Sequence, residues 1–177
     1  MKKIISQEYL NEQKKLHETN INYGIASLGH VNNIKNLLSE TNFKTLCDYG
    51  AGKKNLEKGL LQANFTDFKY FPYDPVFPEY GDPVPSDLVC CIDVMEHIEE
   101  NYLEAVLDDI QRVTLKLCYF SISTVPAKKF LSDGRNAHLI LKPARWWLPQ
   151  LCERFNIEFL KNTKGGFVVI CKSLNNQ

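Results

Sequence analysis

The segment LCDYGAG at residues 46–52 constrains the fold of this chain more than any other feature. It begins as an apolar, strand-like run and ends in Asp48, Gly50 and Gly52, after which a helix-compatible stretch follows. Glycine allows a tight turn and lets a ligand approach main-chain N–H groups that a Cβ would shield. A strand-to-helix turn of this kind is where α/β proteins bind nucleotide-like cofactors. The glycines alone would equally fit a tight turn with no ligand.

A second predicted strand ends in an acid. Residues 67–73 are rich in aromatic side chains and are followed by Asp74. A carboxylate at a strand end can accept two hydrogen bonds from ribose hydroxyls. The alternative is a simple turn, because Asp74 precedes Pro75.

A third predicted strand at residues 87–92 leads into the run DVMEH. Asp93 and Met95 in that run are expected to shape the wall of a cofactor site, with plain core packing as the alternative for Met95. Three successive strands therefore bring polar residues to the same edge of a sheet.

These residues resemble motifs of the class I S-adenosylmethionine-dependent methyltransferases. In that family the first strand is followed by Asp/Glu-x-Gly-x-Gly, the second strand ends in an acid, and the fourth commonly reads Asp-Leu-Val before an Asp-Val-Leu-Glu-His run. The resemblance covers residues 44–125, and small bacterial and phage-encoded members are the most similar type. The matching residues here are Asp48, Gly50, Gly52 and Asp74, then 87–89 and 93–97.

The resemblance implies S-adenosyl-L-methionine as the cofactor and transfer of its methyl group as the reaction. It also implies cofactor contacts at the matching positions. A Tyr-Gly turn at Tyr23, before the core, is a further candidate to lie over the methionine end of the cofactor. The residues expected to bind the cofactor are Tyr23, Asp48, Gly50, Gly52, Asp74, Asp93 and Met95.

Two departures from the family pattern affect the expected structure. Lys53 and Lys54 stand where the family often has a third glycine, and Asn55 stands where a dinucleotide fingerprint would require glycine. In addition, only 12 residues separate Asp74 from Asp87. That is too few for a helix, a strand and a turn, so the third strand and its helix are predicted to be shortened or missing.

The complete pattern predicts an α/β fold, with a Rossmann-like, doubly wound, mostly parallel sheet and an antiparallel hairpin at its end. We expect a single methyltransferase domain over residues 1–177, with a helical cap at 1–42 and the Rossmann-like core at 43–177. The predicted helices are 7–19, 27–40, 53–63, 99–113 and 143–155. The predicted strands are 44–48, 67–73, 87–92, 115–123, 156–162 and 167–173.

Candidates for the acceptor side lie after the third predicted strand and in the polar loop 132–138. His97 and His138 are the catalytic candidates, with a buried structural role as the alternative for His97. His138 can act as a general base, and Arg135 can bind a carboxylate or phosphate, with Asn136 beside it. An exposed turn is the alternative for this loop.

Composition excludes several other classes. The formal net charge is zero, so no global field attracts nucleic acid or an anionic membrane. The six cysteines show no Cys-x-x-Cys pair, and we interpret them as buried free thiols in a reducing compartment. We therefore expect a cytoplasmic protein with no metal site, no membrane span and no duplex DNA partner, and we leave its oligomeric state open.

The acceptor is left open as well. A small molecule methylated at oxygen, nitrogen or carbon is the first hypothesis, because the Pro-Pro-Tyr and Pro-Cys motifs of nucleic-acid methyltransferases do not occur. RNA or a protein side chain is the second, to be judged by a basic face around Lys53, Lys54 and Lys58. A non-catalytic, cofactor-binding partner subunit or regulator is the third. A nicotinamide-dependent dehydrogenase is disfavoured by Asn55.

Overall fold

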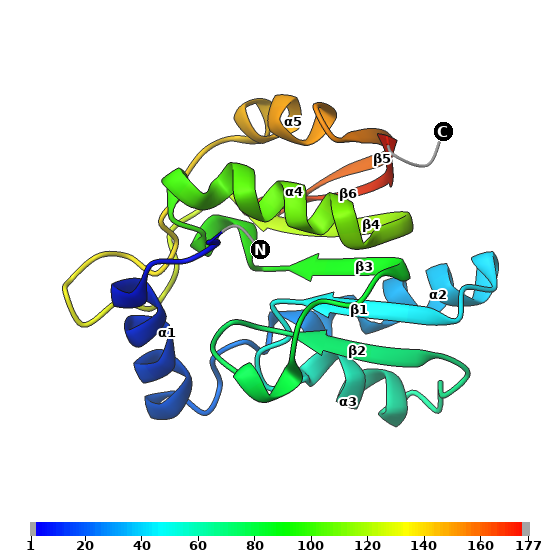
Figure 1. Ribbon diagram of the computed structural model, residues 1–177, viewed down its shortest axis with the longest axis horizontal. Helices are drawn as coiled ribbons and strands as arrows, with labels where there is room; N and C mark the ends of the chain where they lie inside the picture. The colour runs from blue at the N-terminus through cyan, green and yellow to red at the C-terminus, as the bar shows by residue number, and fades with distance from the viewer. Residues whose placement is uncertain (1–2, 175–177) are drawn as a thin grey trace.

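The computed structural model describes residues 3–174, and the ends of the predicted domain, 1–2 and 175–177, lie outside the described residues. Its centre is a six-stranded sheet of order β2-β1-β3-β4-β6-β5 (Figure 1). The pairs β2–β1, β1–β3 and β3–β4 are parallel, whereas β4–β6 and β6–β5 are antiparallel. The strands are β1 (Thr45–Tyr49), β2 (Lys69–Tyr73), β3 (Ser86–Ile92), β4 (Thr114–Ser123), β5 (Phe155–Thr163) and β6 (Gly166–Ser173).

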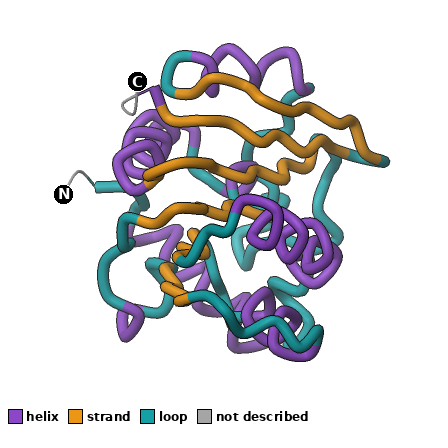
Figure 2. Tube along the Cα trace, turned by 90° about the vertical axis from the view of Figure 1, so that its right-hand side faces the viewer, coloured by secondary structure: helices purple, strands orange, loops and turns teal. Residues whose placement is uncertain are grey.

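Helices cover both faces of this sheet (Figure 2). They are α1 (Gln7–Thr19), α2 (Val31–Thr41), α3 (Asn55–Gln62), α4 (Leu103–Val113) and α5 (Ala144–Cys152). Buried side chains of α4 and α5 pack with one face of the strands, and those of α2 and α3 pack with the other. In β1, Cys47 belongs to the first cluster and Leu46 to the second, as expected when successive side chains alternate between faces. The predicted Rossmann-like, doubly wound fold with an antiparallel edge is confirmed.

The connection between β2 and β3 is short, as the spacing of Asp74 and Asp87 predicts. It contains a single 3₁₀ turn, Pro78–Tyr80, and neither a strand nor an α-helix among its residues, all of which are described. The predicted loss of the third strand and its helix is confirmed.

Helix starts are where prediction and structure differ. The helix predicted at 99–113 begins at Leu103, because two 3₁₀ turns, Met95–His97 and Glu100–Tyr102, take up the preceding residues. The helix predicted at 53–63 begins at Asn55, because Lys54 has a left-handed backbone with φ +56°. Local turns of this kind satisfy helix-end N–H groups without leaving a sequence signal.

Two further helix boundaries differ. The first residues of the helix predicted at 27–40 form a 3₁₀ turn, Ala26–His30, before α2. Pro143, expected within the first turn of a helix at 143–155, instead has an extended conformation and precedes α5, which ends at Cys152.

α1 lies apart from the layers of the sheet, beyond the carboxyl ends of the parallel strands (Figure 1). Its apolar side chains Tyr9 and Leu16 form a separate small cluster with Leu131 and Ala137 of the loop that precedes α5. Within residues 3–174, no helix is both long enough and apolar enough to cross a bilayer.

Candidate functional site

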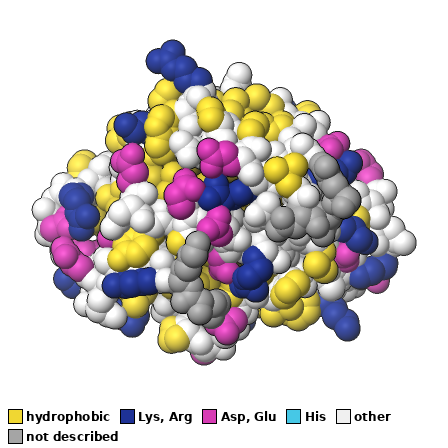
Figure 3. Space-filling model, turned by 45° about the horizontal axis from the view of Figure 1, so that its top comes forward, with side chains coloured by type: hydrophobic (Ala, Val, Ile, Leu, Met, Phe, Trp, Pro, Cys, Tyr) yellow, Lys and Arg dark blue, Asp and Glu magenta, His cyan; other side chains and the backbone are white. Residues whose placement is uncertain are grey.

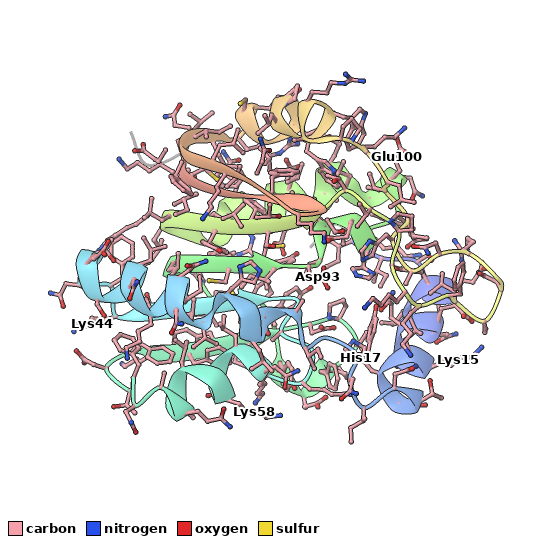
Figure 4. The ribbon with its side chains drawn as sticks, turned by 180° about the vertical axis from the view of Figure 1, so that it is seen from behind. Lys15, His17, Lys44, Lys58, Asp93 and Glu100 are labelled. Atoms are coloured by element: carbon pink, nitrogen blue, oxygen red, sulfur yellow. The ribbon has the colours of Figure 1, made fainter. Side chains whose placement is uncertain are left out.

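A cavity of about 120 Å³ opens at the carboxyl ends of β1, β2 and β3, beneath α1. Parallel α/β sheets bind ligands at this edge. Figure 4 shows Asp93 at the end of β3 and His17 on α1, both at this side of the molecule. The predicted residues that line the cavity are Tyr23, Asp48, Gly50, Gly52, Asp74, Asp93 and His97.

The glycine turn after β1 is held by the end of β2. The N–H groups of Gly50 and Ala51 donate to the carbonyl of Tyr73 at 2.7 and 2.9 Å, and the N–H of Gly52 donates to Asp74 Oδ2 at 2.9 Å. These N–H groups therefore have partners within the protein. Gly50 is required for space, because a Cβ at its φ of +85° would lie 2.3 Å from Val94 Cγ2.

Asp74 is buried and fixes two loops at once. Its Oδ1 accepts the N–H of Val76 at 2.8 Å, while its Oδ2 accepts that of Gly52. Burial raises the pKa of this carboxyl, and the two N–H donors oppose that shift. A carboxylate oxygen has a second lone-pair site, so Asp74 keeps the capacity to accept ligand hydroxyls.

Asp48 is also buried, and the Tyr70 hydroxyl donates a hydrogen bond to its Oδ2. Burial raises the pKa of Asp48 to about 7, against the opposing effect of this hydrogen bond. Asp48 is consequently a cavity carboxyl with a pKa close to neutral pH.

His97 and His138 face each other edge to face, with ring centroids 4.6 Å apart. His97 Nδ1 lies 2.8 Å from the carbonyl oxygen of Ala137, and His138 Nδ1 lies 2.7 Å from that of Val125. Burial lowers the pKa of His97 to about 4, so this imidazole is neutral at pH 7. Asp93 completes the group, since one polar atom from each of the three residues lies within 4.8 Å of the others.

Two residues that follow β3 are unusual: Asp93 in its backbone conformation and Glu96 in its burial. Asp93 has a left-handed backbone with φ +58°, which costs free energy in a residue other than glycine. Glu96 is fully buried, and its Oε1 accepts the N–H of Ser123 at 2.6 Å. Burial raises the pKa of Glu96 well above its ordinary value, and the neighbouring Asp93 adds to this effect.

Other predicted site residues lie outside the cavity. Met95 is fully buried and packs in the core on the α4 side of the sheet. Arg135 is half-exposed and pairs with Asp133, with 2.8 Å between Nε and Oδ2. Asn136 Oδ1 accepts the N–H groups of Ala127 and His138 at 2.9 and 3.0 Å, so this side chain fixes the loop that carries His138.

α1 contributes further residues to the cavity, and their signals in the sequence are weaker. Tyr9, Gln13 and His17 all line the cavity, and the hydroxyl of Tyr23 donates to Gln13 Oε1 at 2.9 Å. Burial lowers the pKa of His17 to about 4. Residues 9, 13 and 17 are spaced by four and lie on one face of a helix. That spacing is the sequence signal for these three residues, none of which is among the predicted site residues.

No family model matches the sequence, and no curated protein matches it. Solved structures do match the fold. One is the 1,6-didemethyltoxoflavin-N1-methyltransferase of Burkholderia thailandensis, bound to 1,6-didemethyltoxoflavin and S-adenosylhomocysteine. It has a TM-score of 0.65 at 12% identity, over 98% of this chain and 92% of that one.

Two other solved structures are similar in the same way. DhpI in complex with S-adenosylhomocysteine has a TM-score of 0.58 at 11% identity, over 95% of this chain and 98% of that one. The mitomycin 7-O-methyltransferase MmcR has a TM-score of 0.69 at 14% identity, and the match covers 94% of this chain and 60% of that one. At these identities the likeness concerns the fold. This chain has the fold of the class I S-adenosylmethionine-dependent methyltransferases.

Proposed function

We propose that this protein transfers a methyl group from S-adenosyl-L-methionine to oxygen, nitrogen or carbon of a small-molecule acceptor. The observation that carries the proposal is one cavity at the carboxyl edge of the sheet that brings together the glycine turn, Asp48 and Asp74. Two solved structures with this fold hold S-adenosylhomocysteine, the product that the cofactor leaves behind.

In this proposal Asp74 accepts hydrogen bonds from the ribose hydroxyls, and the turn of Gly50 and Gly52 lies against the cofactor. Tyr23 and Asp93 line the same cavity and complete the cofactor side. Met95 lies in the core behind Asp93, so its contribution is to the shape of the wall.

The chemistry needs little acid or base from the protein, since the cofactor supplies an electrophilic methyl group. The chain has to hold the acceptor in line with that group and exclude water. α1 serves the second need, because its residues Tyr9, Gln13 and His17 line the cavity.

An acceptor that is a neutral hydroxyl or a protonated amine must also lose a proton during the reaction. His97 and His138 are the proposed residues on the acceptor side, and His97 lines the cavity. Asn136 acts as a positioning residue through its bond to the main chain of His138, and Arg135 stands in the loop as a candidate contact for an anionic acceptor.

An RNA acceptor gains no support from the lysines after the glycine turn. Lys53 Nζ donates to the carbonyl of Asn20 at 2.9 Å, Lys58 Nζ donates to that of Lys53 at 2.7 Å, and Lys54 Nζ lies over the ring of Tyr80. On the face drawn in Figure 3, acidic and basic side chains are interspersed. The three lysines are therefore engaged in contacts within the protein.

A non-catalytic partner subunit would be favoured by an exposed apolar patch around Trp146 and Trp147. Trp147 is fully buried, and Trp146 packs against it edge to face, with 5.1 Å between ring centroids. The enzymatic proposal is the better supported. We further propose that residues 1–177 act as a single domain in the cytoplasm, in line with the buried free cysteines.

Calorimetric titration with S-adenosylmethionine and S-adenosylhomocysteine, with NAD and ATP as controls, tests the cofactor. We expect micromolar binding of the two sulfur compounds only. Radioactive methyl transfer to a panel of phenols, amines and heterocycles then tests the acceptor class. Binding of NAD or ATP in place of the sulfur compounds would contradict the proposal.

Asp74→Ala is predicted to weaken S-adenosylhomocysteine binding by at least tenfold, because it removes the acceptor of the ribose hydroxyls. Lys54→Ala should change the affinity less than twofold. Asp74 also accepts the Gly52 and Val76 N–H groups, so thermal unfolding of Asp74→Ala verifies that the variant remains folded without these two hydrogen bonds. Equal losses in the Asp74 and Lys54 variants would contradict the ribose assignment.

A further inference from the structure

We propose that Asp93, His97 and His138 bind one divalent transition-metal ion beside the cofactor cavity. One ligand atom from each residue lies within 4.8 Å of the other two. The sequence alone predicts no metal site, because His138 lies 41 positions after His97 and 45 after Asp93. The fold brings the end of β3 and the loop before α5 together.

In both imidazoles the hydrogen bond engages Nδ1, so Nε2 is the nitrogen that can bind a metal ion. A carbonyl oxygen can only accept, so the short contacts to Ala137 and Val125 require a proton on Nδ1 of both His97 and His138. A neutral imidazole with its proton on Nδ1 carries its lone pair on Nε2. Metal-binding histidines typically donate their second ring N–H to a carbonyl or carboxylate in this way, which fixes the tautomer and the ring orientation.

The carboxylate of Asp93 also makes the site suitable for a cation. Asp93 has a left-handed backbone, and its carboxylate lies within the group. A carboxylate beside two imidazoles supplies the negative charge and the mixed oxygen and nitrogen donors that a transition-metal ion binds.

The donor set selects the kind of ion. Two imidazoles and one carboxylate suit zinc, iron, cobalt, nickel or manganese, whereas magnesium and calcium prefer oxygen ligands throughout. Ligand bonds of about 2.0–2.2 Å place ligand atoms no more than about 4.4 Å apart around one ion. The 4.8 Å limit on the separations within this group is close to that span.

Three protein ligands leave one or more positions of the ion open. Asp93 and His97 also line the cavity, so an open position can face an acceptor there. If the proposed methyl transfer holds, an ion in this place would bind the acceptor oxygen or nitrogen and lower its pKa. The metal site itself stands independently of that reaction.

The test is titration of the metal-stripped protein with Co²⁺, followed by visible absorption and calorimetry, in a Cys152→Ser background that removes the exposed thiol. We expect one equivalent of Co²⁺ to bind, with zinc displacing it. Asp93→Asn, His97→Gln and His138→Gln should each weaken binding by at least tenfold. Asparagine tolerates the left-handed backbone at position 93, and His30→Gln, which alters a histidine outside the group, should leave binding unchanged.

Failure of stoichiometric binding overturns the proposal, and so does binding that survives all three ligand variants or is lost equally in His30→Gln. Thermal unfolding of each variant verifies that it is folded. S-adenosylhomocysteine titration of the same samples separates the two proposals. Metal binding without cofactor binding would retain this site and reject the methyltransferase, and the reverse result would reject only the metal.

Discussion

At Gly50 the backbone has φ +85°, and Val94 occupies the space that a side chain would need. Gly50→Ala is predicted to lower the free energy of unfolding by about 2–4 kcal/mol, from overpacking together with left-handed strain. Gly134→Ala is the matched control, because Gly134 has φ +89° but open space around it. That variant should lose about 1 kcal/mol. Urea unfolding measures both, and equal losses would show that the contact with Val94 does not decide the effect.

Asp48 predicts how stability depends on pH. Its pKa is about 7 in the folded protein and near 3.8 when exposed, so the folded state keeps a proton that the unfolded chain loses. This proton contributes about 4 kcal/mol to the free energy of unfolding. The contribution is fully present below about pH 4 and is lost as pH rises through 7. Asp48→Asn has no such proton. Wild-type stability should therefore fall relative to the variant between pH 4 and 8 in denaturant unfolding, and parallel profiles would contradict the assignment.

At the scale of elements, Arg154 connects the segment after α5 to α4. Its guanidinium donates to Asp108 at 2.8 Å and to Glu104 at 2.5 Å, and its own side chain is only 11% exposed. We predict that Arg154→Met lowers the free energy of unfolding by about 1–2 kcal/mol, because both acids remain partly solvated. Lys44→Met breaks the exposed pair with Asp67 and should change it by no more than about 0.5 kcal/mol. Thermal unfolding of both variants checks that Arg154→Met has the larger effect. A larger effect of Lys44→Met would contradict the prediction.

Among the elements, the strands could be predicted from the sequence and the helix starts could not. The strands were predictable because apolar runs and terminal acids such as Asp48 and Asp74 mark them directly. Helix starts were not, because Lys54 and the turns before Leu103 adopt conformations that no residue type there demands. The proximity of His97 and His138 was equally hidden. It depends on carbonyls of Ala137 and Val125, and main-chain groups are the same in every sequence.

At the scale of the whole molecule, the reactivity of the cysteine thiols measures how tightly the sheet is packed. Cys152 is exposed, whereas the other five cysteines are buried. Burial raises the pKa of all five buried thiols strongly: Cys47, Cys90, Cys91, Cys118 and Cys171. The native protein should therefore react rapidly with a disulfide reagent at one thiol and the denatured protein at six, as followed by absorbance. Cys152→Ser should remove the rapid reaction, and more than one fast thiol would contradict this packing.

The cluster that holds α1 in place has a consequence for the movement of ligands. Tyr9, Leu16, Leu131 and Ala137 share no member with the two clusters that bury the sheet. Small clusters of this kind separate at a lower free energy than a domain unfolds. We therefore expect local opening of α1 to cost less free energy than unfolding of the sheet, so substitutions in this cluster should change the residence time of a bound molecule while the thermal stability of the sheet stays the same.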